Sequence, residues 1–363
     1  MELLGIDHGT DHAVDGPITL GTLGTSVPIV IAHRGASGYR PEHTLEAYRL
    51  AIAMGADYVE PDLVSTKDGV LVARHENEIG GTTDVADHPE LADRRTTKVV
   101  DGRTITGWFT EDLTLAELKT LRAKERLPQV RPANTTYDGR FEVPTFDEIL
   151  DLVATESIRL GRRIGVYPET KHPSHFASIG LPMEVPLLET LARHGLDHRD
   201  APVFLQSFEV GTLRRLRTMT ALPLIQLVDR AGSPYDLAQV GDGRSYRDLV
   251  SPAGLEEISR YAAGVGVAKE LVLPRDPAGR ITQPTGLVDD AQACGLLVHV
   301  WTLRAENKFL AADFRVGTSP VAFGDAIAED EAFLEAGVDG FFTDQTDLGV
   351  RARERWLRLK QVS

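Results

Sequence analysis

Short apolar segments alternate with amphipathic segments along most of this chain, and this alternation restricts its fold more than any other feature. The apolar segments predict strands at 28–35, 56–64, 69–76, 163–171, 202–208, 222–228, 263–268, 296–303 and 338–344. The amphipathic segments predict helices at 43–55, 145–156, 183–194, 209–218, 253–262, 284–293, 327–336 and 346–360. About eight strand–helix units in succession indicate an α/β fold with a parallel sheet.

Polar side chains gather at the ends of the predicted strands, and they favour one parallel architecture over another. They are Glu60, Asp62, Glu169, Lys171, Gln206, Trp301 and Asp344. In a (β/α)8 TIM barrel the carboxyl ends of the strands form the active face. The alternative is an open doubly wound sheet, which usually carries a glycine-rich phosphate loop, and neither GxGxxG nor GxxxxGK[ST] occurs here. The sequence therefore predicts a barrel.

One long interruption divides the predicted barrel, which is expected to occupy residues 28–350. Residues 77–140 are polar, with a short helix expected near 114–123, and they form an inserted segment after the second strand. A segment of this length between barrel elements usually has a function of its own. Residues 1–27 are expected to be an irregular or hairpin lead-in, and residues 351–363 the end of the C-terminal helix.

Charge and composition exclude several classes of partner. The formal net charge of −15 repels nucleic acid and anionic membranes. No run of apolar residues is long enough to span a bilayer, so stable membrane insertion is not expected. Cys294 is the single cysteine, which rules out an internal disulfide. The first residues do not resemble a signal peptide, so the chain as given is expected in the cytoplasm, or outside it if a leader has been removed.

Three acidic residues suggest a cation site. Glu60 and Asp62 are two positions apart on one predicted strand, so both side chains point the same way, and Glu169 and Lys171 repeat this spacing on another strand. Three carboxylates around one point suit a hard cation such as Mg²⁺ or Ca²⁺. Zinc is less expected because there is no cysteine cluster or HExxH motif. The alternative is that these acids are merely solvated at strand ends.

Two histidines at strand ends, His33 and His75, could supply a general acid and a general base. We expect nearby carboxylates to raise their pKa and keep one of them protonated. Asp344 is expected to be a hydrogen-bond acceptor that closes the barrel rather than a catalyst. Structural roles are expected for His8, His12, His88, His172, His175, His194 and His198.

The charges of the candidate site suit a phosphodiester. The three carboxylates contribute −3, and a divalent cation, Arg34 and Lys171 contribute +4. The sum is about +1, which matches a ligand with one negative charge. An acidic protein can thus hold a phosphate group locally.

Six motifs follow one another along the chain: HRGASGYRPEHT (33–44), YVEPD (58–62), ARHE (73–76), YPETK (167–171), QSF (206–208) and HVWT (299–302). Together they resemble the glycerophosphodiester phosphodiesterase family. The resemblance covers roughly residues 28–350. It implies a (β/α)8 barrel with an inserted segment after the second strand. It also implies metal-dependent hydrolysis of a small-molecule glycerophosphodiester to glycerol 3-phosphate and an alcohol.

The resemblance also implies roles for individual residues. Matched to the motifs, His33 and His75 are the acid–base pair, and Glu60, Asp62 and Glu169 are the metal ligands. The same matching gives Arg34 and Lys171 as phosphate contacts, and Gln206, Phe208 and Trp301 as pocket lining.

Two positions depart from the family pattern and leave the substrate preference open. His43 stands where Asn often follows the PE motif, and Glu76 stands where Asp often follows the catalytic histidine. Two alternatives stay open at this point. One is a phospholipase D-like or cyclising lyase activity on lysophospholipids, and the other is a barrel that binds glycerol phosphate without turnover.

Overall fold

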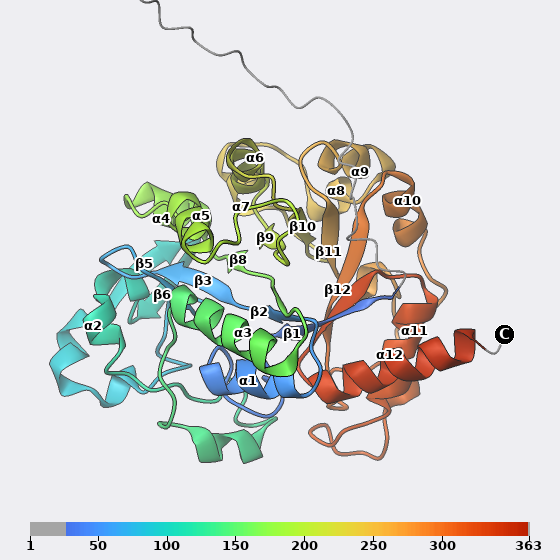
Figure 1. Ribbon diagram of the computed structural model, residues 1–363, viewed down its shortest axis with the longest axis horizontal. Coiled ribbons are helices and arrows are strands. Elements are labelled where there is room, and N and C mark those ends of the chain that lie inside the picture. The colour runs from blue at the N-terminus through green and yellow to red at the C-terminus, as the bar shows by residue number, and fades with distance from the viewer. Residues whose placement is uncertain (1–26, 362–363) are drawn as a thin grey trace, which may run out of the picture.

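A computed structural model describes residues 27–361, and its central feature is a closed parallel barrel (Figure 1). β1 (Ile29–His33) pairs in parallel with β2 (Tyr58–Glu60) on one side and with β13 (Gly340–Thr343) on the other. The remaining barrel strands are β3 (Asp62–Ser65), β7 (Gly165–Val166), β8 (Glu169–Thr170), β9 (Leu205–Ser207), β10 (Leu224–Val228), β11 (Gly264–Ala268) and β12 (Leu297–Leu303). Each pairs in parallel with its neighbours until the circle closes at β1, so the predicted (β/α)8 fold is confirmed.

Two of the predicted strands are broken in the middle by a proline. Pro61 separates β2 from β3, and Pro168 separates β7 from β8. Proline has no N–H to donate to a neighbouring strand, so regular pairing stops there. The backbone continues in the same direction, since β2 pairs with β7 and β3 pairs with β8. β2 and β3 therefore act together as one strand of the barrel, and β7 and β8 act together as the neighbouring strand.

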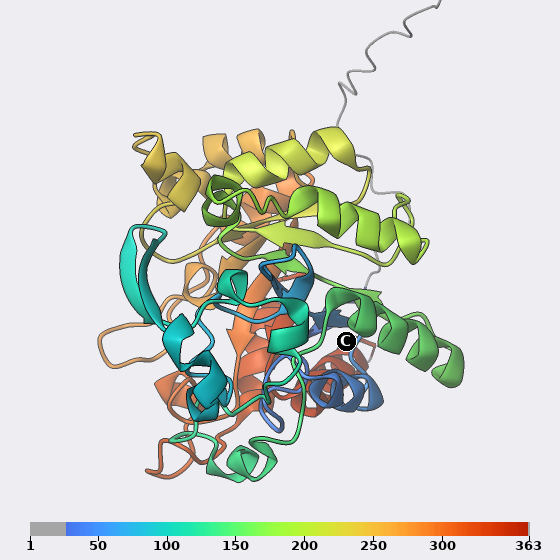
Figure 2. The ribbon, with the colours of Figure 1, turned by 90° about the vertical axis from the view of Figure 1, so that its left-hand side faces the viewer.

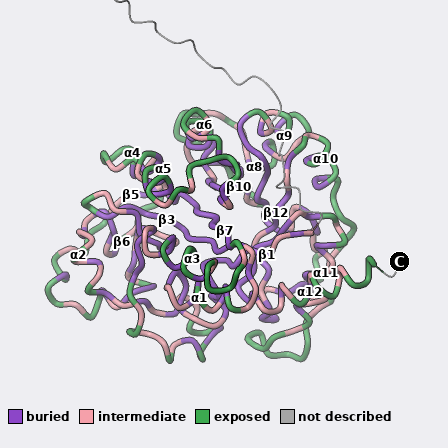
Figure 3. The backbone as a smooth tube through the Cα atoms, in the orientation of Figure 1, coloured by how far each residue is buried: buried purple, intermediate pink, exposed green. Residues whose placement is uncertain are grey.

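Helices surround the barrel, with their exposed faces outward and the buried strands inside (Figure 3). They are α1 (Leu45–Ala53), α3 (Phe146–Leu160), α4 (Pro173–Ser178), α5 (Glu184–Arg193), α6 (Val210–Met219), α7 (Tyr235–Gln239), α8 (Tyr246–Leu249), α9 (Pro252–Ile258), α10 (Leu287–Ala293), α11 (Ala326–Glu335) and α12 (Thr346–Lys360). Short 3-10 turns add η5 (Lys269–Leu271) and η6 (Ala312–Phe314). None of the described helices is long and apolar enough to cross a membrane.

Local signals explain where the longer helices begin and end. In α3, Thr145 and Glu148 form a reciprocal capping box at the start. Gly161 follows the last residue with φ 62°, a left-handed conformation that glycine adopts without a steric cost. The buried face of α3 includes Phe146 and Ile149, which pack in the layer between helices and strands.

One predicted strand does not belong to the barrel. Within 69–76, β4 (Leu71–Ala73) runs antiparallel to β3. A tight turn reverses the chain there, with Gly69 at φ 80°, so the segment returns beside its own strand. Residues 230–252, for which no strand or helix is predicted above, contain the short helices α7 and α8.

The segment 77–140 is made of short elements, and it lies beside the barrel (Figure 2). The elements of this segment are η1 (Val85–Asp87), η2 (Pro89–Arg94), β5 (Thr96–Val100), β6 (Arg103–Gly107), η3 (Thr110–Asp112), α2 (Leu115–Leu118) and η4 (Pro132–Tyr137). The helix expected near 114–123 is therefore present but shorter. The expected lead-in lies almost entirely outside the described residues.

The barrel interior is filled by aromatic and aliphatic side chains. This inner cluster consists of Ile31, Tyr58, Tyr167, Phe204, Ile225 and Phe342. His299 is buried among them, and its Nδ1 lies 2.8 Å from the hydroxyl of Tyr167. A packed interior leaves the carboxyl ends of the strands as the place where polar groups can meet a ligand.

Candidate active site

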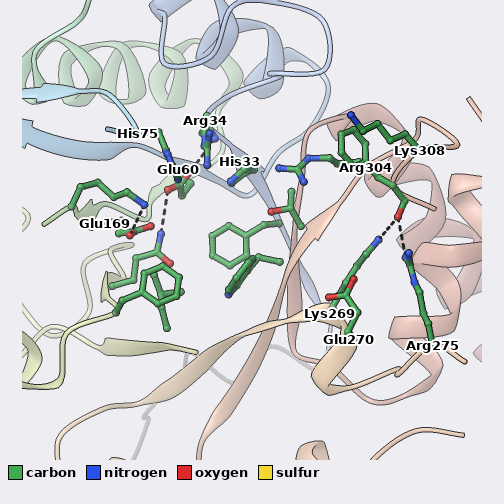
Figure 4. Close-up of a pocket in the computed structure, with 18 residues that line it drawn as sticks. His33, Arg34, Glu60, His75, Glu169, Lys269, Glu270, Arg275, Arg304 and Lys308 are labelled. Atoms are coloured by element: carbon green, nitrogen blue, oxygen red, sulfur yellow. Dashed lines mark hydrogen bonds and ion pairs between the residues drawn. The ribbon is translucent and has the colours of Figure 1, made fainter. Parts of the chain in front are cut away.

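A cavity of about 340 Å³ opens at the carboxyl ends of the barrel strands (Figure 4). All the predicted site residues except Asp62 line it: His33, Arg34, Glu60, His75, Glu169, Lys171, Gln206, Phe208 and Trp301. They come from β1, β2, β8, β9 and β12, and from the residues that follow these strands and the antiparallel strand β4. The barrel therefore brings together side chains that are far apart in the sequence.

The three predicted metal ligands lie together. Each of Glu60, Asp62 and Glu169 offers a carboxylate oxygen, and these oxygens all lie within 4.8 Å of one another. None of the three residues is more than 6% exposed. The alternative that they are solvated acids at strand ends is wrong, because buried carboxylates need partners.

Arg34 and Lys171 alone do not keep all three carboxylates of the cluster ionised, so the full negative charge requires a bound metal ion. Burial, together with the charges of Asp62 and Glu169, raises the pKa of Glu60 well above its ordinary value. Burial also raises the pKa of Glu169 to about 8, and Lys171 only partly offsets this. Although burial opposes it, Lys171 and Arg34 hold the pKa of Asp62 well below its usual range. The cluster thus holds protons that a divalent cation would replace.

The donor set fits a hard divalent ion. It consists of oxygen atoms from the three carboxylates. Gln206 lies against the cluster, with its Nε2 3.3 Å from Oε1 of Glu60. The Oε1 atom of Gln206 is buried and has no hydrogen-bond partner among the described residues, so a further oxygen is available beside Glu60.

His43, which departs from the family pattern, supports this cluster. Its Nε2 lies 2.9 Å from Oδ2 of Asp62, and its Nδ1 lies 2.7 Å from the hydroxyl of Tyr48. The side chain is fully buried. The sequence does not predict this contact, although His43 directly follows Glu42 in the PE motif.

His33 is oriented by an acidic residue from the last barrel strand region. Its Nδ1 lies 2.6 Å from Oδ1 of Asp344. The charges of Arg304 and Arg131 outweigh burial and keep the pKa of Asp344 well below its ordinary value. Asp344 is therefore ionised and can only accept a hydrogen bond from His33. Nδ1 of His33 must then carry the proton, which leaves Nε2 as the nitrogen with a free lone pair.

His75 has the same arrangement on the other side of the cavity. Its Nδ1 lies 2.5 Å from Oε1 of Glu76. Although burial opposes it, His75 and Arg126 lower the pKa of Glu76 well below its usual range. Both predicted catalytic histidines therefore pair with a carboxylate through Nδ1, which fixes the ring orientation.

The expectation that carboxylates raise the pKa of these histidines is wrong. Burial first, and then the charge of Arg34, lowers the pKa of His33 to about 4. Burial, Arg34 and Lys171 lower the pKa of His75 to about 3. Desolvation and neighbouring cations outweigh the paired carboxylates. Both imidazoles are neutral near pH 7 in the protein without ligands.

Two cations face the same space. Arg34 has φ 59°, an uncommon conformation for a residue with a side chain, and its backbone N–H donates to Oε2 of Glu60 at 2.9 Å. Its guanidinium binds Glu42 at 2.9 Å and lies 3.1 Å from Asp62. Lys171 donates to Glu169 at 2.8 Å. The carboxylates thus hold both cations beside the cavity.

Aromatic side chains form one wall of the cavity. Phe208 and Trp301 meet edge to face, with ring centroids 5.8 Å apart. The indole N–H of Trp301 donates to the carbonyl of Gly266 at 2.9 Å, so the ring is held in place. Figure 4 shows Arg304 reaching toward His33 from the far side of the same cavity.

Four residues around the histidines were missed by sequence analysis. They are Glu42, Arg126, Arg131 and Arg304, and all four form ion pairs with residues of the site. Asp344 does accept hydrogen bonds as predicted, but it accepts them from His33 and two arginines. No local pattern marks Arg131, whose partner Asp344 is 213 positions away.

The histidines assigned structural roles lie outside the cavity wherever the structure describes their contacts. His88, His172, His175 and His194 each lie near a carboxylate, and none of them lines the cavity. His8 and His12 lie outside the described residues.

Comparison with known proteins agrees with this geometry. Residues 33–348 match the profile of the Glycerophosphoryl diester phosphodiesterase family. The chain belongs to this family. As a member, it is an enzyme of the phosphodiester hydrolase class.

Two curated relatives cover most of this phosphodiesterase family member. A glycerophosphodiester phosphodiesterase of Arabidopsis thaliana is 38% identical, and the alignment spans 92% of this chain and 87% of the relative. A glycerophosphodiester phosphodiesterase of Haemophilus influenzae is 31% identical over 89% of this chain and 88% of the relative.

Solved structures of the family share the fold. A protein from Silicibacter pomeroyi, named as a putative glycerophosphoryl diester phosphodiesterase, has a TM-score of 0.64 at 22% identity, covering 91% of this chain and 94% of that one. A phosphodiesterase from Oleispira antarctica, solved with the product sn-glycerol-3-phosphate, has a TM-score of 0.58 at 20% identity, covering 91% and 98%.

Proposed function

We propose that this protein hydrolyses glycerophosphodiesters to glycerol 3-phosphate and an alcohol, with His33 and His75 as the acid–base pair. The observation that supports it most is the matched pair of histidines around one cavity. Each donates from Nδ1 to a carboxylate, and each lines a space that also contains the acidic cluster. A barrel that only bound glycerol phosphate would not need two histidines oriented in this way.

The cation in this proposal is Mg²⁺ or Ca²⁺, held by Glu60, Asp62 and Glu169. Oxygen-only ligands suit either ion. When bound, such an ion offsets negative charge that develops on the phosphate oxygens. The paired carboxylates and the raised pKa of Glu169, about 8 without a cation, support a site of this kind.

Arg34 and Lys171 hold the phosphate group in this proposal. Arg34 is anchored by Glu42 and Lys171 by Glu169, so neither side chain has to be ordered when the substrate binds. Arginine can bind two phosphate oxygens at once, whereas lysine acts as a point charge. The aromatic wall of Phe208 and Trp301 then borders the organic part of the substrate.

One histidine removes the proton of the nucleophile through its free Nε2. The other protonates the departing alkoxide, so it must carry a second proton, on Nε2, when the substrate is bound; the negative charge of the phosphodiester beside it favours this imidazolium form. An alkoxide is a poor leaving group, so protonation contributes roughly 10²–10⁴ in rate. The nucleophile is either water or the 2-hydroxyl of the glycerol unit. The hydroxyl would gain from its proximity to the phosphorus atom. A substrate that lacks only this hydroxyl separates the two: near-complete loss of turnover indicates the hydroxyl, and a modest loss indicates water.

A turnover assay tests the proposal. The purified protein is offered glycerophosphocholine, glycerophosphoethanolamine and glycerophosphoglycerol with Mg²⁺ or Ca²⁺, and released glycerol 3-phosphate is measured. We expect hydrolysis that exhaustive chelation abolishes and added cation restores. Release of phosphocholine in place of glycerol 3-phosphate, or binding of glycerol 3-phosphate with no turnover of any diester, would contradict it. Lysophosphatidylcholine in the same assay tests the alternative activity on lysophospholipids.

A further inference from the structure

The segment 77–140 sends two arginines into the wall of the site. Arg131 is buried, with only 7% of its surface exposed. Its Nη2 lies 2.6 Å from Oδ2 of Asp344, and its Nε lies 2.6 Å from Oε1 of Glu306. Its Nη1 also donates to the backbone carbonyl of Ser37 at 3.0 Å. One side chain therefore connects the segment to the loops after β1, β12 and β13.

Arg131 reaches His33 by two short routes. Asp344 uses Oδ2 to accept from Arg131 and Oδ1 to accept from Nδ1 of His33 at 2.6 Å. Ser37, whose carbonyl accepts from Arg131, donates its hydroxyl to the carbonyl of His33 at 2.8 Å. Both the ring and the backbone of His33 are thus held by groups that Arg131 holds in turn.

Arg126 has the equivalent place beside the second histidine. Its Nη2 lies 2.6 Å from Oε2 of Glu76, and Oε1 of Glu76 lies 2.5 Å from Nδ1 of His75. The same guanidinium binds Glu42 at 2.7 Å, and Glu42 binds Arg34 at 2.9 Å. The sequence of contacts is arginine, carboxylate and histidine Nδ1 on both sides of the cavity.

A carboxylate that orients an imidazole must itself be held still. A carboxylate with one oxygen on a histidine can rotate or turn toward solvent if its second oxygen is unpaired. A guanidinium on that second oxygen removes this freedom because its N–H groups have a fixed planar geometry. Small displacements of reacting groups cost large factors in rate, so this kind of support affects catalysis directly.

We propose that the segment 77–140 belongs to the catalytic apparatus, with Arg131 positioning His33 through Asp344 and Arg126 positioning His75 through Glu76. The proposal rests on the acid–base function proposed above. It differs from a specificity role for the segment, because the two arginines act on the histidines and not on the alcohol. Both are positioning residues, since neither lines the main cavity.

Steady-state kinetics on a glycerophosphodiester gives the first test. We expect Arg131→Ala to lower kcat about 10–100-fold with KM changed less than about 3-fold. Arg131→Lys should recover part of the loss. The matched control is Lys119→Ala. Lys119 anchors the same segment to α3 through Glu148 at 2.5 Å and touches neither histidine. It should lower thermal stability and leave kcat unchanged. If both variants lose stability and neither loses kcat, the segment is only anchored by these contacts and the proposal is wrong.

The leaving group shows which histidine each arginine serves. A nitrophenyl ester needs no proton on its leaving group, so it rescues variants that lack the general acid. If the nitrophenyl ester restores turnover in His33→Ala, it should also restore turnover in Arg131→Ala. In the same way, Arg126→Ala should respond to this ester as His75→Ala does. Arg131→Ala should also add less than its full effect to the defect of Asp344→Asn, because both disturb the contact between Asp344 and His33 and only the route through Ser37 is independent of it. Identical rescue of both arginine variants, or full additivity with Asp344→Asn, would overturn the assignment.

A spectroscopic readout separates this proposal from the proposed function. The Nδ1 proton of His33, shared with Asp344, should give a downfield proton resonance that is absent in His33→Gln. We expect it to broaden or disappear through solvent exchange in Arg131→Ala and to remain in Lys119→Ala. An unchanged resonance in Arg131→Ala contradicts the positioning role. This measurement needs no turnover, so it stands even if the wild-type protein hydrolyses none of the diesters, which would refute the proposed function alone.

Discussion

Nδ1 of His33 lies 2.6 Å from Oδ1 of Asp344, a residue 311 positions later in the chain. The contact forms because β1 and β13 are neighbours at the closure of the barrel, where Ala32 is in register with Thr343. The ends of the first and last strands therefore build one histidine–carboxylate pair, which neither strand contains alone.

Asp344→Asn should lower kcat by about 10²-fold or more while KM changes little. The amide has nearly the same shape, but it lacks the charge that holds the proton on Nδ1 of His33, so the opposite tautomer becomes populated. Initial rates over a range of substrate concentrations measure the effect. Circular dichroism and the melting temperature serve as the control for folding, and a loss of less than about 3-fold would argue against the orienting role.

Cation binding should release protons near neutral pH. Without a cation the pKa of Glu169 is about 8 and that of Glu60 is also raised, so at least one proton must leave when the ion binds. Affinity should therefore rise as pH increases from about 6 to 8. Calorimetry in buffers of different ionisation enthalpy counts the protons.

Two variants check the origin of this release. Glu169→Gln should weaken binding of the cation and reduce the number of protons released. Glu270→Gln is the matched control, since Glu270 lines the same cavity but does not belong to the acidic cluster. Proton release that is the same in wild type and Glu169→Gln would show that another group titrates.

His299 should make the fold sensitive to acid. Burial lowers its pKa to about 3 from an ordinary value of 6.5. Between these values the unfolded chain binds a proton that the folded protein does not, so stability falls as pH decreases from 6.5 toward 3. The slope from this one residue approaches about 1.4 kcal/mol per pH unit. His299→Gln should reduce the slope of the unfolding free energy with pH, as measured by urea denaturation.

The slope is the informative quantity here, because a cavity left by the substitution changes stability equally at each pH. The exposed His198 provides the control variant, His198→Gln, which should leave the slope as in wild type. An unaltered slope in His299→Gln would mean that other buried groups dominate the acid response.

Removing the β5–β6 hairpin should change the preference among alcohol groups more than it changes stability. Its turn residue Asp101 lies 2.5 Å from His172, which directly follows Lys171 of the site. Arg126 and Arg131 lie outside the hairpin, so the histidine contacts remain. We expect altered relative rates across several diesters after 96–107 is replaced by a short glycine linker. Unchanged relative rates would show that the hairpin does not affect selectivity.

The sequence by itself determined the barrel and most of its active face. Strand and helix periods are local properties, so alternation along the chain was enough to predict a parallel (β/α)8 sheet. The spacing of Glu60 and Asp62 placed both on one side of a strand, and the motifs around His33 and His75 placed these at strand ends. The structure confirms the barrel and brings His33, His75 and Glu60 to one cavity with Asp62 beside it, while their roles stay predictions.

Predictions from local sequence patterns were wrong where a property depends on residues that become neighbours only in the folded protein. The antiparallel return of β4 depends on a single turn at Gly69, and a strand pattern does not state its direction. The shift in the pKa of His33 and of His75, the two proposed catalytic histidines, was predicted with the wrong sign. It depends on how far burial and Arg34 outweigh the paired carboxylates, which is known only once all these groups have been placed.

Arg126 and Arg131 could be found only in the tertiary structure. They belong to a polar segment whose composition gives no reason to select two arginines. Their partners Glu76 and Asp344 come from different parts of the barrel, and the ion pairs exist because folding brings the segment against both. Charge interactions depend on distance and burial, and neither quantity is encoded in the spacing of residues along the chain.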